Sequence, residues 1–204
     1  YQSIMTDAAG RLVRREVAEV RRRARSIWGR RDRSQWEAFL EEFYAEFEEV
    51  VGRVTRPVLW SLAQQAYAEA MEEIGSNDPM GPDFERFIED YVAAFAARWR
   101  DVSRGQLRQV AAEAEAAGED PLDAIEQRLA EWEERRAEKI GRREPIRAGE
   151  AFAKAAWVLA GVVALRWSVV GETCPFCDQL NGRTVGVQVP FLAKGQTLTA
   201  PGAS

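Results

Sequence analysis

Two cysteines, Cys174 and Cys177, are the residues of this chain best suited to chemistry, and they lie in the stretch VVGETCPFCDQLNGRTVG. Cysteines three positions apart in a tight turn bring two sulfur atoms close enough to share one metal ion, and backbone N–H groups of the turn can donate to them. A structural zinc site needs four ligands, whereas the chain contains no histidine. Glu172 and Asp178 are too near in sequence to fill the other positions, so a metal site within this chain is incomplete.

Two other interpretations of the cysteine pair stay open on the residues alone. A thiol–disulfide centre needs CPFC at the N-terminus of a helix that follows a strand, inside a thioredoxin-like βαβ unit. Here the turn-forming residues DQLNG follow the pair, and no βαβ unit is predicted. The remaining interpretation is structural, with two small side chains buried in a loop.

Charge is unevenly distributed near the start of the chain, although the net charge of −5 names no partner. Residues 11–33 hold ten Arg, and residues 35–52 hold six Glu and no basic residue. We expect solvated, partly complementary helix faces that pair if the segments fold back on each other, and solvated carboxylates at Glu41, Glu42, Glu48 and Glu49. The alternative is a salt-sensitive DNA-binding arm. Its candidate residues are Arg14, Arg15, Arg21, Arg22, Arg23 and Arg25.

Four long helices are predicted before the cysteines, because apolar residues recur there at steps of three and four. They are expected near residues 3–30, 34–74, 82–117 and 121–140. Ser34 should cap the second helix, with Glu37 completing a capping box. Pro57 should kink or break that helix. Asp120 should cap the fourth helix, with Pro121 at its first position. The apolar stripe of the first helix contains Val13, Val17, Val20, Ala24 and Ile27. The apolar stripe of the third helix contains Phe84, Ile88, Tyr91, Phe95, Trp99 and Val102.

The C-terminal part has a different pattern. A fifth helix should start at Pro145 and run to about Gly161, and LRWSVV and RTVGVQV should then pair around the two-residue turn NG. Residues 165–190 thus predict a β-hairpin with the cysteines in or beside its connection. The expected fold is mainly α, a long-helix bundle or extended helical hairpins followed by a small β-hairpin module with a CxxC knuckle. The expected division is a helical body over 1–140 and the module over 141–204.

Composition narrows the class of protein. A hydrophobic content of 46% with 30% charged residues is typical of a folded domain. The longest apolar run, residues 155–165, is far shorter than the roughly 20 residues of a membrane span. The first residues, YQSIMTDAAG, lack the basic and then apolar pattern of a signal peptide. Two cysteines favour a reducing, cytoplasmic setting. Because the sequence has no phosphate-binding Gly-rich loop and no GxSxG elbow, we expect no enzyme.

Residues 140–200 carry a set of motifs in a fixed order: RREPIRAGEAFAKAA, RWSVVGETCPFCDQLNGRTV and FLAKGQTL. Together they resemble the Mu F-like minor head proteins of tailed bacteriophages. The family pattern has an Arg-Glu helix start, a tryptophan strand, a Thr-Cys-Pro-x-Cys turn and an l-x-G step. The matching residues are Arg143, Glu144, Trp167, Thr173, Cys174, Pro175, Cys177, Leu180 and Gly182.

The resemblance implies a zinc site and a role in virion assembly. Family members commonly carry a His-Pro-x-Cys-x-Cys-like segment after the equivalent of FLAKGQTL, and the sequence starts at Tyr1 without Met. We therefore expect a piece of a longer protein, in which Cys174 and Cys177 bind zinc with ligands beyond residue 204. The implied function is a minor head protein in procapsid assembly, with portal and major capsid proteins as partners. Contact with packaged DNA and homo-oligomers are further expectations. The implied locations are the bacterial host cytoplasm and the virion head.

Overall fold

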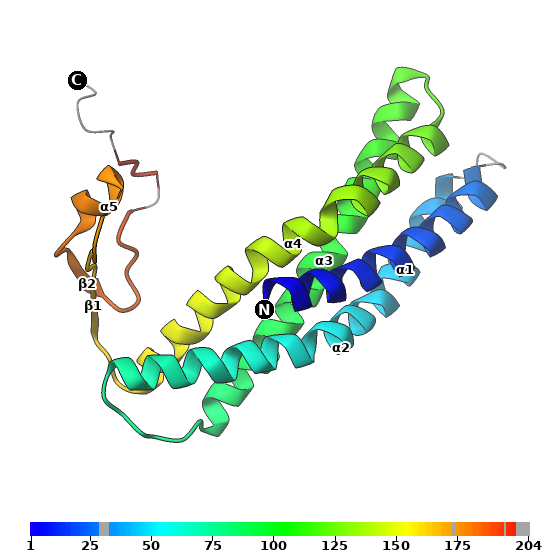
Figure 1. The fold of residues 1–204 in the computed structure, drawn as a ribbon. Coiled ribbons are helices and arrows are strands. Elements are labelled where there is room, and N and C mark those ends of the chain that lie inside the picture. The colour runs from blue at the N-terminus through cyan, green and yellow to red at the C-terminus, as the bar shows by residue number, and fades with distance from the viewer. Residues whose placement is uncertain (29–32, 173, 194, 199–204) are drawn as a thin grey trace, which may run out of the picture.

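The computed structural model describes residues 1–28, 33–172, 174–193 and 195–198. Four long helices run up and down as a bundle, and a small unit follows beyond the end of the last one (Figure 1). The helices are α1 Gln2–Trp28, α2 Arg33–Glu73, α3 Pro82–Ala117 and α4 Pro121–Leu159. The small unit contains β1 Ala164–Arg166, α5 Pro175–Leu180 and β2 Thr184–Gly186. The predicted fold class is confirmed.

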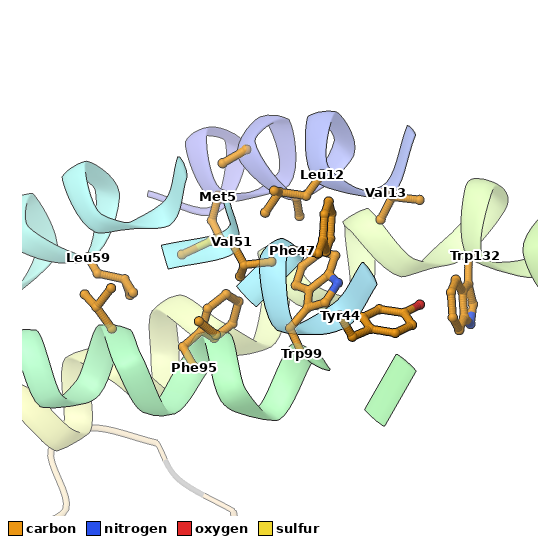
Figure 2. Close-up of a cluster of buried hydrophobic side chains, with 14 of the residues drawn as sticks. Met5, Leu12, Val13, Tyr44, Phe47, Val51, Leu59, Phe95, Trp99 and Trp132 are labelled. Atoms are coloured by element: carbon orange, nitrogen blue, oxygen red, sulfur yellow. The ribbon is translucent and has the colours of Figure 1, made fainter. Parts of the chain in front are cut away.

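One continuous apolar core runs between the four helices. α1 packs on α4 and α2, and α3 packs on the same two helices from the other side. Figure 2 shows part of this core, where Phe47 and Val51 of α2 lie among side chains from α1 and α3. A fully buried large aliphatic or aromatic side chain contributes roughly 1.5–3 kcal/mol, so helices this long are stabilised chiefly by their shared face.

The predicted apolar stripe of α1 is confirmed in full, since all five of its residues are buried. The predicted stripe of α3 is wrong at its end. Val102 is 51% exposed, and Ser103 takes the buried position instead. The serine is accommodated there because its hydroxyl accepts a hydrogen bond from Arg136 at 2.6 Å. A polar partner on α4 therefore overrides the apolar pattern.

One of the two predicted helix N-caps is present in the structure. The Asp120 side chain accepts from the backbone N–H of Leu122 at 2.9 Å, with Pro121 at the first helical position, as predicted. The predicted capping box of α2 is wrong: the helix already includes Arg33, and the Glu37 carboxylate accepts from Arg108 at 2.6 Å. The expected end of the first helix near residue 30 lies outside the described residues.

Pro57 does not break its helix and Pro145 does not start a new one, because both prolines lie inside continuous helices. Pro57 is in α2 and Pro145 is in α4. The helices expected at 121–140 and from Pro145 are therefore one helix, and residue 140, the predicted end of the helical body, lies within it. An interior proline costs about 3 kcal/mol or more. Burial on both sides offsets this cost, with Val51 and Leu59 around Pro57 completely buried.

α1 and α4 are in tight contact at Thr6 and Gly141. A Cβ atom added to Gly141 would lie 1.8 Å from Thr6 Oγ1 and 2.9 Å from Thr6 Cβ. Only glycine fits this crossing. Because glycine has no side chain, Gly141 lets the two helices pack closely here.

Ion pairs connect helices in a pattern that differs from the predicted pairing of charge blocks. Acidic residues of α2 bind arginines of α3: Glu41 contacts Arg104 and Arg108, and Glu48 contacts Arg100. Glu41 and Glu48 are therefore not merely solvated, which corrects the expectation for these two. Within the described residues, the basic block of α1 pairs with α4 instead.

The two strands pair antiparallel, with Ala164 opposite Gly186 and Arg166 opposite Thr184. The predicted two-residue turn is wrong. Asn181 and Gly182 lie at the end of α5, and residues 167–183 form the connection. Gly182, at φ +77°, donates from its N–H to the Trp167 carbonyl at 2.8 Å. The cysteines lie inside this connection, as predicted.

Among the described residues, no helix has an apolar stretch long enough to cross a lipid bilayer.

Candidate metal centre

The two cysteines lie at the N-terminus of α5. Cys174 is the residue that caps this helix, in an extended conformation, and Pro175 occupies the first helical position. The Cys174 sulfur accepts a hydrogen bond from the backbone N–H of Cys177 at 3.4 Å, and the two sulfur atoms lie 3.2 Å apart. The sequence folds this way because proline suits the first position of a helix, and an N-cap acceptor satisfies a free N–H group.

The electrostatics of the two thiols differ. The backbone N–H of Cys177, followed by its side chain, lowers the pKa of Cys174. The hydrogen bond with Cys174, followed by desolvation, raises the pKa of Cys177. The first deprotonation therefore falls on Cys174, which is exposed. A solvent-accessible thiolate is the form of cysteine that binds metals and attacks disulfides.

The cysteine geometry fits half of a metal site. The two adjacent sulfurs can share one ion. The hydrogen bond from the Cys177 N–H to the Cys174 sulfur resembles the hydrogen bonds that orient ligands around a bound metal. Within the part of the chain that the structure describes, however, no three Cys, Asp or Glu side chains gather closely enough to hold an ion. A bound zinc would need ligands from elsewhere.

The unit that carries the cysteines is thinly packed. We call residues 162–198 the cysteine module. Leu180 and Val187 are its buried apolar residues among those described, and the Trp167 and Phe191 rings meet edge to face at 5.3 Å. None of its strands or its helix contacts α1–α4, and Figure 1 shows it set off from the bundle. Units below about 40 residues usually need a disulfide, a metal or a partner for stability.

The cysteine module also exposes apolar side chains. Val170 is 90% exposed, and Val163, Phe176 and Val189 are exposed as well. Phe176 lies between the two cysteines in sequence and is 42% exposed. Apolar groups gathered on a small unit are typical of a surface that another molecule covers.

Most of the arginines proposed for DNA are engaged elsewhere. Arg21 donates to Glu126 and Glu133 of α4, both at 2.8 Å, and Arg25 also binds Glu126. Within α1, Arg22 binds Glu19, and the Arg23 guanidinium lies 5.3 Å from the centroid of the Phe39 ring of α2. Arg14 and Arg15 have no acidic partner among the described residues. The structure thus brings four of the six candidates into contacts within the bundle.

Sequence reasoning missed a polar cluster at the centre of the bundle. Glu16 of α1 is fully buried, and its carboxylate accepts from Tyr44 at 2.8 Å, Trp99 at 3.0 Å and Arg136 at 3.1 Å. Burial, followed by the nearby carboxylate, raises the pKa of Tyr44 well above its ordinary value. A signal was available, because Glu16 falls in step with the buried Val13, Val17 and Val20. The cluster joins all four helices.

A second internal carboxylate is Glu144, one of the residues that carried the family resemblance. The resemblance placed Arg143 and Glu144 at a helix start, whereas both lie well inside α4. The Glu144 carboxylate accepts from Tyr91 and Arg98, each at 2.8 Å, so it ties α4 to α3. Thr173, another matched residue, lies outside the described residues.

No family model, curated protein or solved structure matches the chain.

Proposed function

We propose that this chain acts as a minor head protein in phage procapsid assembly, with a structural rather than a catalytic role. The observation that carries the proposal is the state of the cysteine module: it buries few side chains, stands apart from the bundle and holds two paired thiols at the start of α5. Such a module is best explained by a ligand and a partner that complete it. The motif resemblance over residues 140–200 supplies the kind of partner.

The helical bundle supports this role as a rigid base. Its internal charges are used in structural contacts, with Glu16 bound to Arg136 and Glu144 to Arg98. Helices of 36 to 41 residues, such as α2 and α3, span about 55–60 Å at 1.5 Å per residue. A bundle of this length can contact portal or capsid proteins along its sides while it holds the cysteine module at one end.

Cys174 and Cys177 would hold zinc in this proposal. The metal would cross-link the module to ligands from outside the described residues, either from sequence that follows residue 204 or from another chain. Cys174, as the more acidic thiol, would lose its proton first. The N–H of Cys177 would keep the Cys174 sulfur oriented toward its partner sulfur.

The test is co-purification of the intact gene product with its cognate portal and major capsid proteins. The wild-type protein is expected to associate with at least one of them. Cys174→Ser/Cys177→Ser is expected to weaken that association while leaving the helical circular dichroism signal unchanged. The matched control is Ser168→Ala, an exposed position of the same module. Absence of association with both partners would contradict the proposed function.

A thiol–disulfide function is the second candidate, and one observation favours it. CPFC does begin a helix, and the exposed Cys174 has the lowered pKa that a reactive thiol needs. α5 lies between β1 and β2, but these strands pair antiparallel, whereas the strands of the βαβ unit in thioredoxin-like proteins are parallel. Turnover of a small disulfide with added dithiothreitol tests this candidate, and a rate no higher than that of Cys174→Ser would exclude it.

A further inference from the structure

A groove of about 640 Å³ lies between α3 and α4, on the bundle and away from the cysteine module. The apolar surface of its floor comes from Val102 of α3 and Ile140 of α4. The rings of Phe95, Trp99 and Trp132 also line the groove, but they lie under the guanidinium groups of Arg98 and Arg136. Val102 is the exposed residue at which the predicted stripe of α3 fails. Its side chain therefore offers apolar surface inside the groove.

One wall of the groove carries a row of cations. Arg135, Lys139, Arg143 and Arg147 line it at four-residue intervals along α4, and all four are exposed. A step of four residues rises about 6 Å, so the row extends for about 18 Å. Among the described residues, Lys139, Arg143 and Arg147 have no ion-pair partner, and Arg135 has a 3.4 Å contact with the exposed Glu134.

The other basic residues of the groove are already engaged. Arg98 binds Glu144, Arg128 binds Glu131, and Arg136 binds Glu16. The two acidic residues that line the groove are therefore used within these pairs. The row on α4 remains as positive charge that none of the described acidic residues of the groove neutralises, beside an apolar floor.

We propose that this groove binds an acidic amphipathic helix of a partner protein. The apolar face of such a helix would cover Val102 and Ile140, and carboxylates at four-residue spacing would meet Lys139, Arg143 and Arg147. A helix laid in a groove is recognised through residues at steps of three and four, and the row on α4 has the step of four. Charge complementarity would set orientation and speed association.

The groove suits a protein helix better than a nucleic acid. The rings of Phe95, Trp99 and Trp132 are each at most 5% exposed, so bases have no aromatic surface on which to stack. A phosphate backbone would contact the cations but would leave the exposed Val102 uncovered. The inference is independent of the cysteine module, so the two proposals fail separately.

The test uses a synthetic 20-residue helical peptide with a leucine stripe flanked by Glu at i and i+4, labelled for fluorescence anisotropy. Lys139→Glu/Arg143→Glu/Arg147→Glu is expected to weaken its binding by about tenfold or more, and Val102→Asp by several-fold. The matched control, Arg11→Glu/Arg14→Glu/Arg15→Glu, changes the net charge equally on an exposed face of α1. It is expected to change affinity by less than about threefold through long-range charge alone. Circular dichroism establishes that each variant is folded.

Three results would overturn the proposal. The first is no binding of the peptide at low salt, where attraction between charges is strongest. The second is equal loss of affinity in the α1 control, because this would mean attraction to net charge rather than to the groove. The third is a single-stranded oligonucleotide of thymidines that binds through the same α4 residues while the peptide does not, which would assign the groove to nucleic acid.

Discussion

Arg136 of α4 donates a hydrogen bond to the fully buried carboxylate of Glu16 on α1, at 3.1 Å. The same guanidinium lies 4.3 Å from the centroid of the Trp99 ring and 4.4 Å from that of Trp132. A buried charge is stable only when it is paired and hydrogen-bonded. This contact therefore fixes the relative position of α1 and α4 at the centre of the bundle, where Tyr44 adds the donor from α2.

Glu16→Ala is expected to destabilise the bundle by about 3–5 kcal/mol, because it leaves the Arg136 charge and two other donors buried without their acceptor. Urea unfolding followed by circular dichroism measures the change. Glu19→Ala is the control, since Glu19 binds the exposed Arg22 within the same helix, and a solvent-exposed ion pair contributes little to stability. Equal losses in the two variants would contradict the role given to Glu16.

Gly141→Ala is expected to destabilise the bundle by about 1–3 kcal/mol, because the new Cβ would overlap Thr6 and force α1 away from α4. Gly149→Ala is the matched control on the same helix, where a Cβ would meet nothing within 4 Å. That variant is expected to stabilise by about 0.5–1 kcal/mol through helix propensity. Thermal unfolding of both variants makes the comparison, and a neutral Gly141→Ala would show that the crossing is looser than described.

Local signals in the sequence predicted much of the bundle. The cap at Asp120 and the apolar stripe of α1 depend on residues near one another in the chain, so both were predictable. The prolines were not, because the cost of Pro57 or Pro145 is local whereas the burial that offsets it comes from other helices. The partner of each charged residue also depends on which helices become neighbours, and Glu16 could not be assigned to Arg136 without that arrangement.

The candidate metal centre was predictable only in part, for a similar reason. The spacing of Cys174 and Cys177 predicted that their sulfurs would be close, and they are. Their place at a helix N-terminus was not predicted, because the turn signal at Asn181 and Gly182 suggested a hairpin turn. The isolation of the cysteine module follows from contacts that are missing between distant segments, and no residue pattern encodes this directly.

Alkylation of the thiols by iodoacetamide is expected to be faster at Cys174 than at Cys177. The lowered pKa of Cys174 means more thiolate at neutral pH, so its rate should reach half its maximum at a lower pH than for an ordinary cysteine. The raised pKa of Cys177 shifts its own profile to higher pH. Peptide mapping by mass spectrometry over pH 6–10 (roughly the range of thiol titration) separates the two. Faster reaction at Cys177 would contradict the assigned asymmetry.

Leu180→Ala and Leu129→Ala test whether the cysteine module and the bundle are stabilised separately. Leu129 is fully buried in the bundle, so its truncation is expected to cost about 2–5 kcal/mol in the main unfolding transition. Leu180 is buried in the module, and its truncation is expected to change that transition by less than about 0.5 kcal/mol. Hydrogen exchange should instead become faster in residues 162–198 alone. A large effect of Leu180→Ala on the bundle would mean that the two parts are coupled.

Acid is expected to weaken the ion pairs between α2 and α3. The hydrogen bond from Arg108 is the main cause of the lowered pKa of Glu41. A carboxylate whose pKa is lowered by folding contributes stability above its unfolded pKa of about 4.3, and this stability is lost as the pH falls through the lower folded value. Glu41→Gln should therefore show a shallower loss of stability below about pH 4.3 than the wild type does. The same acid slope in both proteins would remove Glu41 from this account.

The zinc content of the intact gene product, measured by mass spectrometry of the metal after dialysis, tests the central claim most directly. The account predicts about one zinc per chain, a value near zero for Cys174→Ser/Cys177→Ser, and slower hydrogen exchange in residues 162–198 when zinc is present. An intact protein that binds no zinc, with exchange in the cysteine module unchanged by added metal, would contradict it.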